Sequence, residues 1–148
     1  MEIFHDGAIE KMKKFAPIIL RIGMSLVVLW FGTQQILNTE MWTSLIPTWL
    51  TSMSGIDASL WVQFNGAFEI VFGLCLLLGY FTRVTAFLLA FHMLDITLTV
   101  GYTSVGVRDF GISMAMLAVF LNGMDAWSFD MLMKKEEEEN LPAYPDLS

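Results

Sequence analysis

The sequence predicts an all-α membrane protein: a bundle of four transmembrane helices with an amphipathic segment at the outer interface between helices 1 and 2. The chain has 148 residues, enough for one domain, and is 55% hydrophobic but only 16% charged. An average soluble domain is about one quarter charged and has too little interior to bury so much apolar surface. Disorder requires low hydrophobicity and high charge. Soluble globular and disordered classes are therefore excluded.

The predicted spans cover residues 17–37, 60–79, 84–102 and 107–129. A bilayer core needs about 20 apolar residues per helix, and the first three segments have that length. The fourth apolar run ends near Leu121 and reaches full length only if it continues through Trp127 and Phe129. Residues 1–16 form a predicted cytoplasmic N-terminal segment, and residues 131–148 a predicted acidic cytoplasmic tail.

The basic residues predict the orientation of the bundle. Those on the side of the two termini are Lys11, Lys13, Lys14, Arg21, Arg83, Lys134 and Lys135, whereas Arg108 lies on the opposite side. By the positive-inside rule, both termini face the cytoplasm.

The outer segment 38–59 has no Lys or Arg and carries apolar residues at helical spacing: Met41, Trp42, Leu45, Ile46, Trp49 and Leu50. Tryptophan is typical of membrane interfaces. We interpret this part of the chain as an amphipathic segment at the outer interface, either a cap on the bundle or a gate for a substrate.

Polar residues inside the spans are the candidate functional residues, because ionisable groups in a membrane are costly. At a rise of about 1.5 Å per residue, Asn65 and Glu69 lie roughly 9 and 15 Å from the outer face. His92 and Asp95 lie about 15 and 20 Å from the inner face. Glu69 is thus level with His92 and Asn65 nearly level with Asp95, which predicts a two-rung polar ladder between two antiparallel helices.

The ladder has two interpretations. A Glu–His pair in a low-dielectric site can hold or relay a proton near physiological pH, as quinone chemistry requires. The same groups can instead satisfy one another and set the helix register. At the outer mouth, Arg108 and Asp109 either cap the fourth helix or bind an anion or ring carbonyl together with Gln34 and Gln35.

Composition excludes several kinds of cofactor and partner. The net charge is −7, so the basic face needed to bind nucleic acid is missing. A single cysteine, Cys75, excludes a disulfide framework and a multi-thiolate metal site. With only His5 and His92, we expect no bis-histidine haem within one chain. No haem, flavin or metal site is evident.

Several short motifs in order along the chain resemble the DoxX/DoxD family of small four-helix membrane proteins. They are Leu20-Arg21-Ile22-Gly23, Leu29-Trp30-Phe31-Gly32, Asn65-Gly66-Ala67-Phe68-Glu69, Gly79-Tyr80-Phe81-Thr82-Arg83 and Arg108-Asp109. The resemblance covers residues 17–130 and implies a prokaryotic plasma membrane protein. It implies a subunit linked to quinone reduction, as in a thiosulfate:quinone oxidoreductase, a partner in oxidative-stress complexes, or an assembly factor. Glu69, Arg108 and Asp109 match motif positions, whereas His92 and Asp95 rest on the depth argument.

The leading hypothesis is therefore a quinone-linked redox subunit, expected not to be catalytic on its own. In it Glu69, His92 and Asp95 handle protons, while Asn65, Arg108, Asp109 and Gln34 bind the ligand. The alternative is a non-catalytic accessory or assembly subunit of a larger membrane complex, and a transporter or proton channel ranks third. Expected partners are the lipid bilayer and other membrane subunits or further copies of this chain.

Overall fold

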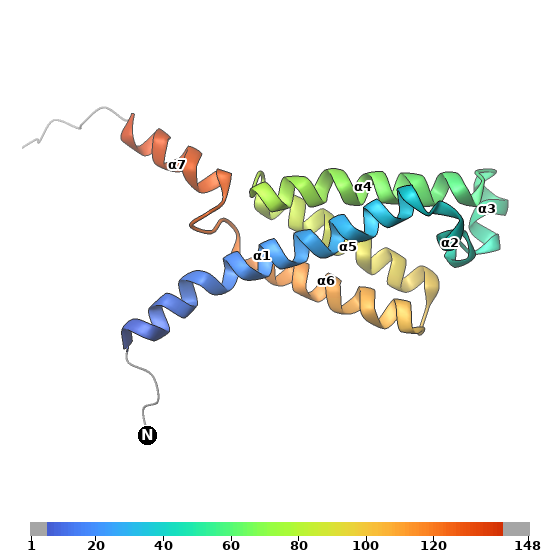
Figure 1. Cartoon of the computed structure of the whole chain (residues 1–148), viewed down its shortest axis with the longest axis horizontal. Coiled ribbons are helices and arrows are strands. Elements are labelled where there is room, and N and C mark those ends of the chain that lie inside the picture. The colour runs from blue at the N-terminus through green and yellow to red at the C-terminus, as the bar shows by residue number, and fades with distance from the viewer. Residues whose placement is uncertain (1–5, 141–148) are drawn as a thin grey trace, which may run out of the picture.

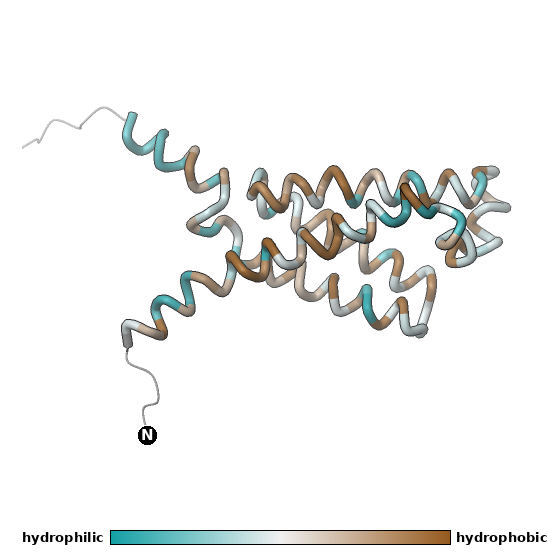
Figure 2. The backbone as a smooth tube through the Cα atoms, viewed as in Figure 1, coloured by the Kyte–Doolittle hydropathy of each residue, from teal (hydrophilic) through white to brown (hydrophobic). Residues whose placement is uncertain are grey.

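The computed structural model describes residues 6–140, and this part of the chain is helical without strands (Figure 1). The elements are α1 (Asp6–Leu37), α2 (Thr39–Trp42), the 3-10 helix η1 (Thr43–Leu45), α3 (Thr48–Ser54), α4 (Ala58–Leu78), α5 (Thr82–Val100), α6 (Ser104–Asn122) and α7 (Phe129–Glu139). By length and composition, α1, α4, α5 and α6 can each cross a membrane. Figure 2 shows apolar residues along all four. The predicted fold class is confirmed.

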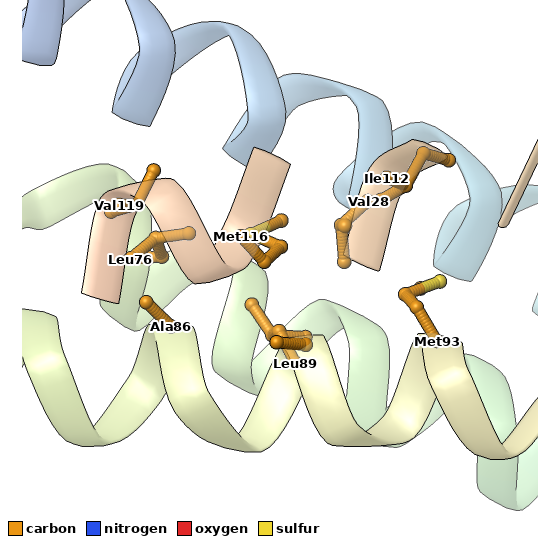
Figure 3. Packing of buried hydrophobic residues seen from close by; sticks show 9 residues of the cluster. Val28, Leu76, Ala86, Leu89, Met93, Ile112, Met116 and Val119 are labelled. Carbon is orange, nitrogen blue, oxygen red and sulfur yellow. The ribbon is translucent and has the colours of Figure 1, made fainter. Parts of the chain in front are cut away.

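The bundle consists of two helix pairs. The most extensive contacts are between α1 and α4 and between α5 and α6, and the contacts that join one pair to the other are fewer. Buried apolar side chains from all four helices fill the seam between the pairs, among them Val28, Leu76, Leu89, Met93 and Met116 (Figure 3). The outward faces carry exposed large apolar side chains, as lipid contact requires.

The predicted interfacial segment folds as three short helical pieces, α2, η1 and α3. Pro47, which has no backbone N–H to donate, separates η1 from α3, and Gly55 ends α3 with a φ of 67°. Trp42, Leu45 and Leu50 are half-buried against the bundle, while Trp49 is exposed. The segment thus covers the outer end of the bundle.

The fourth transmembrane helix is shorter than predicted. It ends at Asn122 rather than at residue 129, because Gly123 adopts a φ of 77° and its Cα faces the Arg83 side chain. A Cβ at Gly123 would lie 2.5 Å from Arg83 Nε. The chain then turns, and α7 begins at Phe129. The predicted N-terminal segment is helical from Asp6, and residues 1–5 and 141–148 of the predicted tails lie outside the described part.

A buried ion pair joins α1 to the loop after α6. Arg21 Nε donates to Asp125 Oδ2 at 2.6 Å, Nη2 donates to Asp125 Oδ1 at 3.2 Å, and Nη1 donates to the Leu76 carbonyl at 2.9 Å. Arg21 is 1% exposed and Asp125 4% exposed. Arg21, which the sequence places among the boundary cations, is therefore a buried link between α1, the last turn of α4 and this loop.

Asp130 closes the same end of the bundle by capping α5 from a distance. Its two carboxylate oxygens accept the backbone N–H groups of Phe81 at 2.8 Å and Thr82 at 2.7 Å, and its own N–H donates to the Gly79 carbonyl at 3.1 Å. These N–H groups belong to the start of α5, where the helix offers them no internal partner. Phe81 occupies the N-cap position of α5, but its side chain has no hydrogen-bond acceptor for these N–H groups. The Asp130 carboxylate takes over this role.

Replacing Asp130 with alanine is expected to lower the free energy of unfolding by about 1–2 kcal/mol, the usual cost of losing a helix cap. Thermal unfolding of the detergent-solubilised protein measures this loss. The matched control is Glu136→Gln, which removes an exposed carboxylate on the same helix. Equal melting temperatures for the two variants would show that Asp130 does not stabilise α5.

Candidate functional site

A cavity of about 210 Å³ lies in the outer half of the bundle, between the two helix pairs. The short helices of the interfacial segment line one side of it through Trp42, Leu45 and Leu50, and aromatic side chains from α1 and α4 line others through Phe31, Trp61 and Phe64. Its polar lining residues are Gln35, Asn65, His92, Asp95, Thr99, Arg108 and Asp109. The site therefore draws residues from both helix pairs and from the interfacial segment.

A hydrogen-bonded cluster of three side chains holds Glu69 beside the cavity. Gln35 Nε2 donates to Glu69 Oε2 at 2.9 Å, and Asn65 Nδ2 donates to Gln35 Oε1 at 2.8 Å and to Glu69 Oε1 at 3.3 Å. Glu69 is 1% exposed and Gln35 4% exposed. Both carboxylate oxygens therefore have a neutral amide donor, and the Glu69 side chain has a defined position.

The structure brings Glu69 and His92 together, as the depth argument predicts. His92 Nε2 lies 3.7 Å from Glu69 Oε1, too long for a hydrogen bond. The imidazole stacks on Phe68, with ring centroids 4.5 Å apart. His92 Nε2 is buried and has no hydrogen-bond partner among the described residues. The first predicted contact is therefore a close approach of Glu69 and His92 without a hydrogen bond, which leaves His92 Nε2 without a polar partner among the described residues.

The second predicted rung does not form. The Asn65 amide is directed to Gln35 and Glu69 instead of Asp95, since these two acceptors lie within its reach. Asp95 lines the same cavity, but its side chain is exposed and makes no hydrogen bond or ion pair within residues 6–140. Asn65 and Asp95 therefore share the cavity without pairing.

Arg108 lies at the rim of the cavity in an aromatic and acidic environment. Its Nε donates to Asp109 Oδ1 at 2.7 Å, and its guanidinium carbon lies 4.2 Å from the Phe31 ring centroid, a cation–π contact. The Asp109 side chain is buried, whereas that of Arg108 is 38% exposed. The guanidinium Nη atoms make no hydrogen bond to other described residues, so they can donate to a ligand.

Gln35, not Gln34, contributes to the site. Gln34 accepts a hydrogen bond from Asn38 Nδ2 at 2.7 Å and does not line the cavity. Successive helix positions differ by about 100° in direction, so only one of two adjacent glutamines can face α4. The sequence pattern that distinguishes them is the spacing from a glycine: Gln35 follows Gly32 by three residues, as Glu69 follows Gly66.

These two glycines bring α1 and α4 into direct backbone contact beside the polar cluster. A Cβ on Gly32 would lie 2.8 Å from the Gly66 carbonyl oxygen and 2.9 Å from Glu69 Cβ. A Cβ on Gly66 would lie 2.9 Å from the Gly32 carbonyl oxygen and 3.0 Å from Gln35 Cβ. Small residues permit such close helix crossings in membranes. The crossing sets the distance across which Gln35 reaches Glu69.

The fold and the site define a small integral membrane protein with four transmembrane helices and, between two helix pairs, a largely apolar cavity that carries several polar side chains. The DoxX family model matches residues 16–102, more than half of the chain, and the protein belongs to this family. The match includes α1 from residue 16 onward, α4, α5 and Glu69, and ends before Arg108 and Asp109. No curated protein and no solved structure matches the chain.

Proposed function

We propose that this DoxX protein binds the ring of a quinone in the outer cavity and exchanges protons with it, as the membrane subunit of a quinone-linked oxidoreductase. The observation that carries the proposal is the cavity lining. Gln35 and Asn65 from one helix pair and His92 from the other line the cavity, and Arg108 adds free donors at the rim. Glu69 does not line the cavity itself but lies 3.7 Å from His92 Nε2. Quinone ring oxygens require donors of this kind.

The cavity size supports a ring-sized ligand. Pockets for drug-sized molecules hold about 300–1,000 Å³, whereas this cavity holds about 210 Å³. It therefore suits one ring system, and the isoprenoid chain of a quinone would extend into the surrounding lipid. Phe31, Trp42 and Trp61 offer aromatic faces and edges to such a ring.

The residues of the site suit proton transfer better than electron transfer. Reduction of a quinone consumes two electrons and two protons, and an electron donor from a partner subunit would have to supply the electrons. His92 Nε2 is free to hold or release a proton toward a ring oxygen, and Glu69 lies close enough to exchange that proton with the imidazole. Gln35 and Asn65 orient the Glu69 carboxylate. Asp95 supplies an exposed carboxylate on the cavity wall.

Glu69→Gln tests the proposal, because it keeps the side-chain shape and removes the charge. Titration with a short-chain quinone can be followed by quenching of tryptophan fluorescence, since Trp42 and Trp61 line the cavity. We expect the dissociation constant to rise roughly tenfold, because the amide would disturb the hydrogen bonds by which Glu69 positions the cavity-lining Gln35 and Asn65 side chains. The control is Glu40→Gln, an exposed carboxylate that does not line the cavity. Wild-type affinity in both Glu69→Gln and Arg108→Gln would contradict the proposal.

One observation favours the alternative of an accessory or assembly subunit. Asp95 is exposed on a transmembrane helix without a partner in the described residues, and membrane charges usually pair. A cationic group of another subunit could supply that partner. Wild-type protein that binds no quinone in the titration, but purifies in a larger membrane complex, would favour this function. The distribution of basic residues supports an orientation with both termini in the cytoplasm.

A further inference from the structure

A second cavity, of about 410 Å³, lies at the opposite end of the bundle from the quinone site. It is formed where the first turns of α1 and the whole of α7 diverge from the bundle (Figure 1). Its lining includes Lys14 and Pro17 of α1, Met124 and Asp125 of the loop after α6, and Met131 and Lys135 of α7. We refer to these six residues as the inner groove.

The inner groove carries two positive charges that no ion pair within residues 6–140 neutralises. Both Asp125 oxygens are already engaged, Oδ2 by Arg21 and Oδ1 by Arg21 and the Trp127 N–H. Neither Lys14 nor Lys135 forms an ion pair within residues 6–140, whereas the neighbouring Lys134 pairs with Glu138 at 3.6 Å. None of the four glutamates 136–139 lines the groove. Its local excess charge is therefore positive, although the whole chain is acidic.

The apolar residues of the groove indicate an amphipathic ligand. Pro17, Met124 and Met131 line the groove together with the two lysines, and Met124 is 41% exposed. The apolar part of α1 begins at about Pro17, so Lys14 and the groove lie at the level of the lipid headgroups. Lysine side chains at this level extend their ammonium groups to the interface. Basic pockets beside transmembrane helices are typical binding sites for anionic lipid headgroups.

We propose that the inner groove binds one anionic phospholipid, with its phosphate between Lys14 and Lys135 and its glycerol and first acyl carbons on Met124 and Met131. A free phosphate ion would use the two lysines but not the methionines. The lipid joins α1 to α7, which have no other described ion pair between them. This site is independent of quinone binding, since it shares no lining residue with the outer cavity.

The test is native mass spectrometry of the full chain in detergent, titrated with phosphatidylglycerol or with phosphatidylcholine. We expect one tight phosphatidylglycerol adduct and none of comparable affinity with phosphatidylcholine. Lys14→Gln/Lys135→Gln should weaken the adduct roughly 30-fold, from the usual contribution of two lysines near anionic lipid. Lys13→Gln/Lys134→Gln has the same net charge and leaves the groove residues intact, so its affinity should stay within about threefold of wild type.

Equal weakening in the two double variants would overturn the proposal, because it would show attraction to overall charge rather than binding in the groove. A third titration in the same experiment uses inorganic phosphate in place of a lipid. A phosphate adduct that replaces phosphatidylglycerol and is lost in Lys14→Gln/Lys135→Gln would also overturn it, in favour of a free anion. Circular dichroism of both variants shows that the comparison is made on folded protein.

Discussion

Replacing Arg21 with leucine is expected to lower the free energy of unfolding by about 3–5 kcal/mol, the largest effect we predict for one side chain. The substitution leaves Asp125 as an unpaired buried carboxylate and removes the donor from the Leu76 carbonyl. Arg21 and Asp125 are both nearly inaccessible, so water cannot replace the lost contacts. Unfolding in increasing sodium dodecyl sulfate, followed by circular dichroism, measures the change.

The double variant Arg21→Leu/Asp125→Leu separates the ion pair from the packing of its two side chains. Buried pairs replaced together by apolar residues are often neutral in stability. We therefore expect the double variant to recover much of the loss, but not all of it. The Leu76 carbonyl and the Trp127 N–H still lose a partner. A double variant as unstable as Arg21→Leu, or a loss below about 1 kcal/mol in the single variant, would contradict the assigned role.

Replacing Gly32 with alanine is expected to cost about 1–3 kcal/mol, the range observed for overpacked interiors. The added methyl group would meet the Gly66 carbonyl oxygen at 2.8 Å, and backbone atoms cannot rotate out of the way as a side chain can. α1 and α4 must therefore separate. Because Gln35 and Asn65 span this crossing, the shift should also lengthen the Gln35–Glu69 hydrogen bond and weaken quinone binding.

Two other glycines serve as graded controls for Gly32→Ala. At Gly73 an added methyl group would meet side-chain atoms alone, Leu29 at 3.0 Å and Val28 at 3.5 Å, so the cost should be smaller. At Gly111 nothing lies within 4 Å, and stability should be unchanged or slightly higher because alanine favours a helix. Detergent unfolding and quinone titration of the three variants check the order. A loss at Gly111→Ala equal to that at Gly32→Ala would contradict a contact-specific effect.

The two proposed ligand sites lie at opposite ends of the bundle and depend on different parts of this framework. The proposed quinone site depends on the Gly32–Gly66 crossing, whereas the inner groove is built next to the Arg21–Asp125 pair. Asp125 lines the groove while its charge is neutralised by Arg21, and this leaves the two lysines in excess. The effect of a substitution on ligand binding at one end can therefore be measured without directly altering the residues of the site at the other end.

Hydropathy was sufficient to predict the fold class and four spans, because a helix in lipid must satisfy its backbone hydrogen bonds within itself. The helix ends were predicted less accurately than the helices themselves. Apolar residues after Leu121 suggested a longer fourth helix, but the backbone turns at Gly123, where Arg83 occupies the space that a side chain would need. Asp130 illustrates the same limit, since its role as a cap for α5 depends on a neighbour far away in the chain.

The depth of each site residue in the membrane could be predicted from the sequence, whereas its hydrogen-bond partners depend on how the helices pack. Counting along each helix placed Glu69 level with His92, because rise per residue is constant. Direction around each axis and the choice of neighbour depend on packing, which the close approach of Gly32 to Gly66 decides here. That contact turns Gln35 instead of Gln34 toward Glu69 and draws Asn65 away from Asp95. Likewise, Arg21 and Asp125 are 104 residues apart, and only the folded bundle brings the charges together.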